Sequence, residues 1–146
     1  MPADYIIRSI DMLRVTIFPP AIVPQLVAPL PLVGTSTNMI VFHMPVCLEG
    51  DELPPMVRGL PLTYQAPPFV TPGAGMLEVQ LTPLNKTLQT KNGGKAILIK
   101  GGQFPARLMV VAPAMQPTPA GPIPDPVLTK PGIAEFITSN YFVKAW

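Results

Sequence analysis

The chain has 146 residues, of which 48% are apolar and only 12% are charged, and its mean hydropathy is +0.38. Disordered chains are polar and highly charged, so this composition excludes a disordered protein despite 22 prolines and 11 glycines. Soluble domains carry about 25% charged residues, roughly twice the fraction in this chain. We therefore expect part of its surface to be apolar and covered by a partner. The net charge of +2, without a dense basic and aromatic stripe, argues against nucleic-acid binding.

The first 36 residues combine an ambiguous segment with a proline-rich one. Residues 4–18 fit either a helical face or a strand that stops at Pro19-Pro20, and we expect a short helix or turn followed by a strand. Residues 19–34, PPAIVPQLVAPLPLVG, are expected to run extended, as an arm or wrapping strip, because proline lacks a backbone donor.

The uncharged run 15–48 could be mistaken for a membrane span by hydropathy alone. Its prolines exclude a membrane helix, since each removes a helical hydrogen bond. They also interrupt the apolar region that a signal peptide requires, and no clear cleavage site follows. We therefore expect synthesis in the cytoplasm without a signal peptide.

From residue 37 onward the sequence predicts strands separated by proline and glycine. Residues 39–44 form an apolar run typical of a strand buried on both faces, and residues 77–82 alternate between apolar and polar side chains. Asn92-Gly93-Gly94 predicts a tight turn, followed by strands at 95–100, 104–112 and 134–146. Residues 113–126 contain six prolines. We predict one mostly β domain over 1–146, a small compact cone of short strands, with 1–36 as the N-terminal segment and arm and 37–146 as the β body.

Catalytic chemistry finds little support in this sequence. The chain has one histidine, one cysteine, three serines and no Gly-x-Ser-x-Gly motif. His43 and Cys47 are four residues apart, but Pro45 lies between them and no third group is suggested to orient them. We therefore predict that the protein is not an enzyme.

The same pair is the only candidate for a metal site. A zinc site needs about four nitrogen or sulfur ligands, and one chain supplies only His43 and Cys47. A complete site would require a carboxylate such as Asp51, water, or the same residues from other copies, for example three His43 side chains on a trimer axis. The alternative is that His43 and Cys47 are packing residues.

The C-terminal half resembles a known family. KAILIKGGQFPARLMVVAPAMQPTPAGPIPDP, residues 95–126, followed by GIAEFITSNYFVKAW, is similar to the PAAR-like spike-tip proteins of bacterial contractile injection systems, which are related to phage tails. The Pro-Ala-Ala-Arg motif is degenerate here: 105–107 reads Pro-Ala-Arg, and 113–115 reads Pro-Ala-Met.

The resemblance implies a structural tip that caps and sharpens the trimeric central spike and helps to pierce the target membrane. It further implies a metal such as Zn or Fe at the point, a role that only His43 and Cys47 can carry here. Effector cargo is another implied partner, and the protein would belong to an assembled or released particle. Two alternatives remain: another structural part of a phage-like particle (baseplate, tube-terminating or capsid-associated protein), and an independent ligand-binding or hydrolytic β domain.

Overall fold

A computed structural model describes residues 3–146, and β-strands account for nearly all of its regular structure. The only helical element in this part of the chain is the short 3₁₀ turn η1, Pro24–Leu26. The strands that build the central sheet are β2 (Met12–Ile17), β3 (Leu30–Pro31), β6 (Leu62–Ala66), β7 (Phe69–Val79), β10 (Phe104–Ala112), β11 (Met115–Gln116), β12 (Ile123–Pro124) and β13 (Thr129–Ile137). The mostly β fold predicted from the sequence is confirmed.

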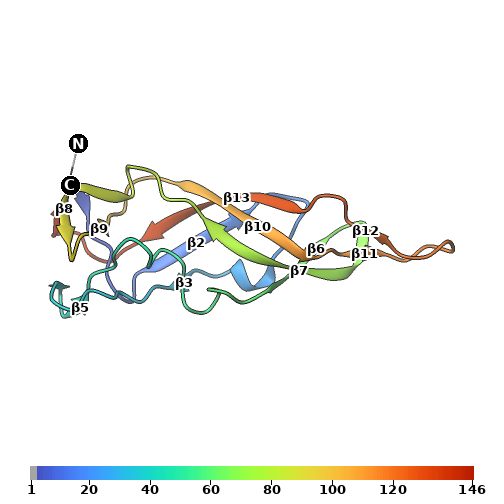
Figure 1. The fold of residues 1–146 in the computed structure, drawn as a ribbon, viewed down its shortest axis with the longest axis horizontal. Helices are drawn as coiled ribbons and strands as arrows, with labels where there is room; N and C mark the ends of the chain where they lie inside the picture. Colours follow the sequence, from blue (N-terminus) through green and yellow to red (C-terminus); the bar gives the residue numbers. More distant parts are fainter. Residues whose placement is uncertain (1–2) are drawn as a thin grey trace.

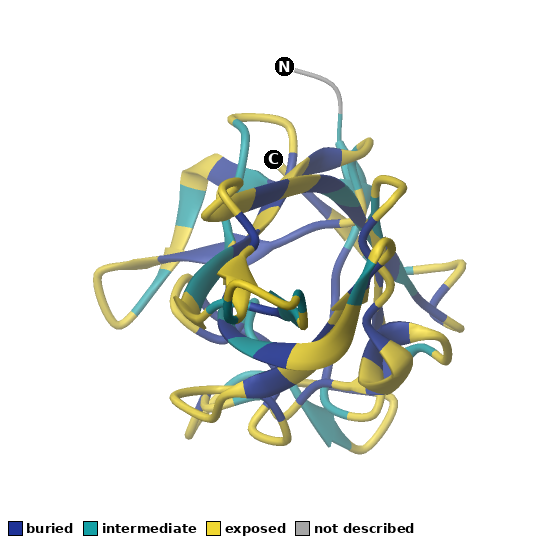
Figure 2. Cartoon of the chain, turned by 90° about the vertical axis from the view of Figure 1, so that its right-hand side faces the viewer, coloured by how far each residue is buried: buried dark blue, intermediate teal, exposed yellow. Residues whose placement is uncertain are grey.

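The central sheet curls around a buried interior, as Figure 2 shows in a view along the long axis of the molecule. Its strand order is β12-β11-β7-β10-β13-β2-β3. Strand β6 also pairs with β7, on the edge opposite to β10. Segment 18–23 returns from β2 toward β6, where Ile22 forms a bridge with Gln65, so the sheet nearly closes on itself. This closure protects most strand edges from unwanted pairing.

Alternating side chains of the long strands supply the main core. Phe104 and Phe136 lie 1% and 2% exposed, with ring centroids 4.9 Å apart, and Leu13 and Leu108 are fully buried beside them. The strands β7, β10 and β13 are nine to eleven residues long. Together with β2, these strands give the molecule an elongated shape (Figure 1).

Three two-stranded ladders gather at the end of the molecule that carries both chain termini (Figure 1). They are β1 (Asp4–Tyr5) with β14 (Lys144–Ala145), β4 (Ile40–Val41) with β5 (Met44–Pro45), and β8 (Lys86–Asn92) with β9 (Lys95–Leu98). A second, smaller core that includes Ile6, Val46 and Ile97 holds these ladders together.

The N-terminal part contains strands where a short helix or turn followed by a strand was expected. The segment 4–18 forms β1 and β2 without a helix, and β2 pairs with β13 along its whole length. Leu13 and Val15 are buried in the main core, which explains why this segment is integral to the sheet. The proline-rich segment that follows packs along the domain, with Val23, Leu26, Leu30 and Leu32 buried. No helix within residues 3–146 is long and apolar enough to cross a membrane.

Candidate functional site: an aromatic end and a proline-rich tip

The structure places the two predicted metal ligands in different surroundings. His43 is exposed in the turn between β4 and β5, whereas Cys47 is fully buried in the main core. Burial raises the pKa of the Cys47 thiol and so disfavours the thiolate that binds metals. Within residues 3–146 no three His, Cys, Asp or Glu side chains lie together as a metal site would require. These residues do not fit a metal site within one chain, and a site shared between copies through His43 stays a prediction.

The turn that carries His43 has an unusual backbone. Phe42 and His43 have φ angles of 49° and 67°, a left-handed conformation that glycine or asparagine normally supplies. Buried Arg8 supports the turn by donating to the carbonyl oxygens of Val41 and Phe42 at 3.4 and 3.2 Å. Its guanidinium carbon also lies 5.4 Å from the centroid of the Phe42 ring. A strained turn built on a bulky aromatic residue suggests that the exposed Phe42 side chain is kept for a function.

Phe42 belongs to a cluster of partly exposed aromatic side chains that we call the aromatic end. Its ring lies 5.8 Å from that of Phe142, edge to face, and the Tyr5 and Tyr141 rings meet similarly at 6.0 Å. Phe142 is 80% exposed and Trp146 is 49% exposed. The aromatic end consists of Tyr5, Phe42, Tyr141, Phe142 and Trp146. Exposed aromatic clusters of this kind are typical of protein interfaces.

Three exposed lysines lie close to the aromatic end. Lys91 and Lys95 are exposed on the β8–β9 hairpin, which is joined to Trp146 by two backbone hydrogen bonds. Lys144 Nζ lies 4.7 Å from the Tyr5 ring centroid. Among the nearby acids, Glu49 is paired with Lys86 at 2.7 Å, and that hydrogen bond lowers the pKa of Glu49. A partner for this end would therefore present apolar groups surrounded by acidic ones.

The opposite end of the molecule narrows to a single hairpin, which we call the tip hairpin, residues 113–126 (Figure 1). Strands β11 and β12 form its stem, and the turn beyond them is closed by hydrogen bonds between the backbones of Thr118 and Gly121. Six prolines restrict its backbone and reduce the entropy that ordering costs. The segment is therefore suited to form a stiff point.

A buried polar cluster fixes the base of the tip hairpin to the sheet. The Tyr64 hydroxyl donates to Asp125 Oδ2 at 3.0 Å and accepts from the Ala114 backbone N–H at 2.9 Å. Lys130 Nζ lies 2.5 Å from the same Asp125 oxygen, and both side chains are at most 8% exposed. Ala114 and Asp125 are the residues that flank the stem of the hairpin, so the cluster ties both of its legs to the body.

The electrostatics of this cluster favour a charged Asp125. Burial on its own raises the pKa of this carboxyl group, but hydrogen bonds from Lys130, the Val127 N–H and the Tyr64 hydroxyl outweigh it. The pKa of Asp125 therefore lies below its ordinary value. Burial is also the main cause of the raised pKa of Tyr64, so the hydroxyl remains a donor.

Sequence reasoning did not identify either the aromatic end or the buried cluster. Phe42 and Phe142 come from segments a hundred residues apart, and Tyr64 and Asp125 are 61 residues apart. The one available signal was the clustering of three aromatic residues, Tyr141, Phe142 and Trp146, within six positions of the sequence.

Comparison with known proteins identifies a family for the chain. A comparison with curated proteins gives no match. A family model described as contractile injection system spike tip protein matches residues 1–146, and so extends the similarity from the C-terminal half to the whole chain. The spike-tip family expected from the sequence is confirmed, and the chain belongs to the family of contractile injection system spike tip proteins.

Proposed function

We propose that this protein caps the central spike, with the aromatic end docked on the spike and the tip hairpin pointing forward. The observation that carries this orientation is the contrast between the two ends. One end is broad, and the other narrows to a single hairpin (Figure 1). The broad end carries the aromatic side chains with the exposed Lys91, Lys95 and Lys144 nearby, and the hairpin carries six prolines. An end that must bind needs exposed apolar surface, whereas a leading end needs a narrow, stiff profile.

The forward end supports the proposal that the protein sharpens the spike and helps to pierce a target membrane. A point transmits force only if its base does not yield, and the buried cluster of Tyr64, Asp125 and Lys130 joins the hairpin to the strands β6 and β13. Buried, fully paired polar groups open at a high cost in free energy. The tip hairpin would then move with the body as one unit when it contacts the membrane.

The aromatic end supports docking on a trimeric spike. We expect the blunt end of the spike to present apolar side chains at its centre and acidic side chains at its rim, complementary to Phe42, Phe142 and the surrounding lysines. Phe42 is the expected anchor, because left-handed backbone at an L-residue costs about 1–2 kcal/mol and would be retained for what the side chain binds. In this role the chain acts as a structural component and performs no catalysis.

The anchor role is tested by two neighbouring substitutions with opposite predictions. Phe42→Asn relieves the backbone strain but removes the ring, whereas His43→Gly relieves the strain and keeps the ring. Both variants should unfold at the same temperature as the wild type or a higher one. Only Phe42→Asn should lose about tenfold or more of its occupancy in purified particles, measured as tip relative to spike by quantitative mass spectrometry.

A third substitution serves as the control for removal of an exposed apolar side chain. Val70 is 74% exposed on β7, far in sequence from the aromatic end. Val70→Asn should leave particle occupancy unchanged. Equal occupancy of the wild type and Phe42→Asn would contradict docking through the aromatic end.

A further inference from the structure

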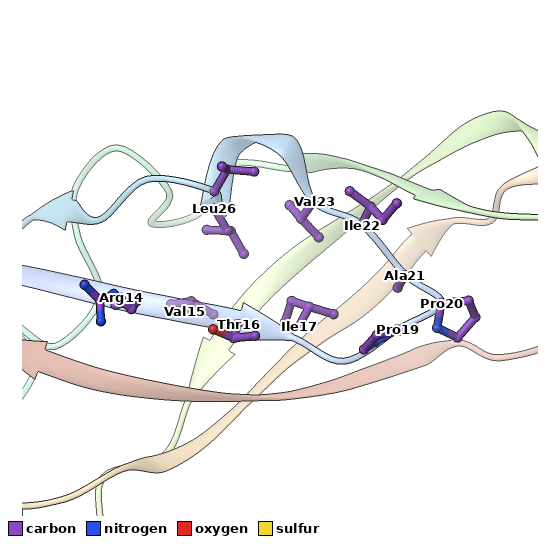
Figure 3. A pocket seen from close by; sticks show the side chains of 11 residues that line it. Arg14, Val15, Thr16, Ile17, Pro19, Pro20, Ala21, Ile22, Val23 and Leu26 are labelled. Carbon is purple, nitrogen blue, oxygen red and sulfur yellow. The ribbon is translucent and has the colours of Figure 1, made fainter.

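A groove on the flank of the domain lies where the curled sheet fails to close. It has a volume of about 480 Å³ and runs between β2 and the segment that returns from Pro20 to Val27 (Figure 3). The exposed apolar side chains of Ile22 and Val27, 50% and 81% exposed, stand on its wall. Its only charged lining residue in the described chain is Arg14, which is paired with Glu135 at 3.0 Å.

One wall of the groove is an open strand edge. Pairing between β2 and β3 stops at Leu13, although β2 continues to Ile17. Phe18 N donates to the Pro131 carbonyl on the β13 side, so the alternation of an antiparallel ladder turns the N–H and C=O groups of Val15 and Ile17 toward the groove. Within residues 3–146, no backbone or side-chain group hydrogen-bonds to Val15 or Ile17 from this side.

The opposite wall offers a second edge. Ile22 uses both its N–H and its carbonyl to bond Gln65 of β6, at 2.7 and 2.8 Å. In extended backbone the N–H and C=O groups of successive residues point to opposite edges, so those of Ala21 and Val23 point toward β2. The Val23 carbonyl already accepts a hydrogen bond from the Leu26 N–H. Figure 3 shows Ala21, Ile22 and Val23 lying across the groove from β2. The groove thus occupies the position of one missing strand.

We propose that this groove binds an extended, uncharged segment of a second protein, which adds to the sheet as a strand along Val15–Ile17. Outward-facing backbone donors and acceptors are satisfied by another extended chain, which fixes the class of ligand as a polypeptide. The apolar, charge-poor lining selects a segment with apolar and hydroxyl side chains, because a charged side chain would lose its hydration there without gaining a partner. The site lies on the flank, so its occupation leaves both ends of the molecule free.

The proposal is tested with a defined probe, a five-residue peptide of alternating threonine and valine with both ends blocked. Titration into the ¹⁵N-labelled protein should shift the amide signals of Val15 and Ile17 and slow their hydrogen exchange, with half-saturation below about 1 mM. The same peptide with N-methylated valines should bind at least about tenfold more weakly, because it lacks the donors that pair with the edge.

Variants on the groove wall make the result specific. Val27→Arg places a charge in the groove at an 81% exposed position, so folding should be unaffected while peptide binding falls about tenfold. Val70→Arg, at a 74% exposed position outside the groove, should bind like the wild type. The proposal is overturned by the absence of saturable shifts up to the solubility limit, or by equal binding of the N-methylated peptide. It is also overturned if the same signals shift with protein concentration alone, because the occupant would then be a second copy.

Discussion

Substitution of Tyr64 by phenylalanine should loosen the base of the tip hairpin without disturbing the core. The Tyr64 side chain is fully buried. Phenylalanine keeps the same ring in the core and removes only the hydroxyl. The change deletes one hydrogen bond to a charged carboxylate, worth about 1.5–3 kcal/mol, and leaves the buried Ala114 N–H without a partner at a cost of about 1–3 kcal/mol. Because such contributions overlap, we expect a loss of about 2–4 kcal/mol in the free energy of unfolding.

Urea denaturation measures the loss in the free energy of unfolding, thermal denaturation measures the change in melting temperature, and amide hydrogen exchange measures local opening at the tip hairpin. At about 2–4 °C per kcal/mol for a domain of this size, the melting temperature should fall by roughly 5–15 °C. Exchange at the Ala114 amide should accelerate more than exchange in β10. Tyr141→Phe is the matched control, since Tyr141 is 59% exposed, and it should change stability by less than about 0.5 kcal/mol. A Tyr64→Phe variant as stable as this control would refute the role of the cluster.

Three further outcomes follow from the structure. The pKa of Asp125 lies below its unfolded value of about 3.9, so its charge contributes stability above that pH. The stability difference between the wild type and Asp125→Asn, measured by urea denaturation from pH 8 to pH 3, should hold down to about pH 4 and shrink below it; a constant difference contradicts this account. Buried Cys47, whose thiol pKa is raised, should react with an aromatic disulfide reagent at pH 8 only as fast as the protein unfolds, and rapid reaction of the native protein would show an accessible thiol. Gly101→Ala should cost more than about 1 kcal/mol by thermal unfolding, since φ is +51° and a Cβ would meet the Leu84 carbonyl oxygen at 2.2 Å, whereas Gly102→Ala, with open space, should cost little.

Several strands were predictable because local pattern and tertiary environment agree. Residues 104–112 were expected as a strand and form β10 with those bounds. The expected Asn92-Gly93-Gly94 turn joins β8 to β9, and both glycines have positive φ. Of the strand expected at 77–82, residues 77–79 form the C-terminal end of β7, where Leu77 is buried and Glu78 is exposed, and residues 80–82 lie beyond the strand. In these segments the signal lies within a few neighbouring residues.

Other features depend on contacts that no local pattern encodes. Residues 39–44 were expected as one buried strand, but they form the β4–β5 hairpin because Arg8, distant in sequence, supports a left-handed turn at residues without glycine or asparagine. The placement of β2 inside the sheet depends on its pairing with β13, more than a hundred residues away. The aromatic end and the buried cluster arise in the same way, since long-range packing brings their members together.

The orientation of the tip on the spike is the central claim, and site-specific photo-crosslinking in assembled particles tests it most directly. A photoreactive phenylalanine analogue is placed either at Phe142, 80% exposed on the aromatic end, or at Ala120, exposed in the turn of the tip hairpin. We predict a crosslink to the spike protein from position 142 and none from position 120. A crosslink to the spike from position 120 with none from position 142 would contradict the proposed orientation.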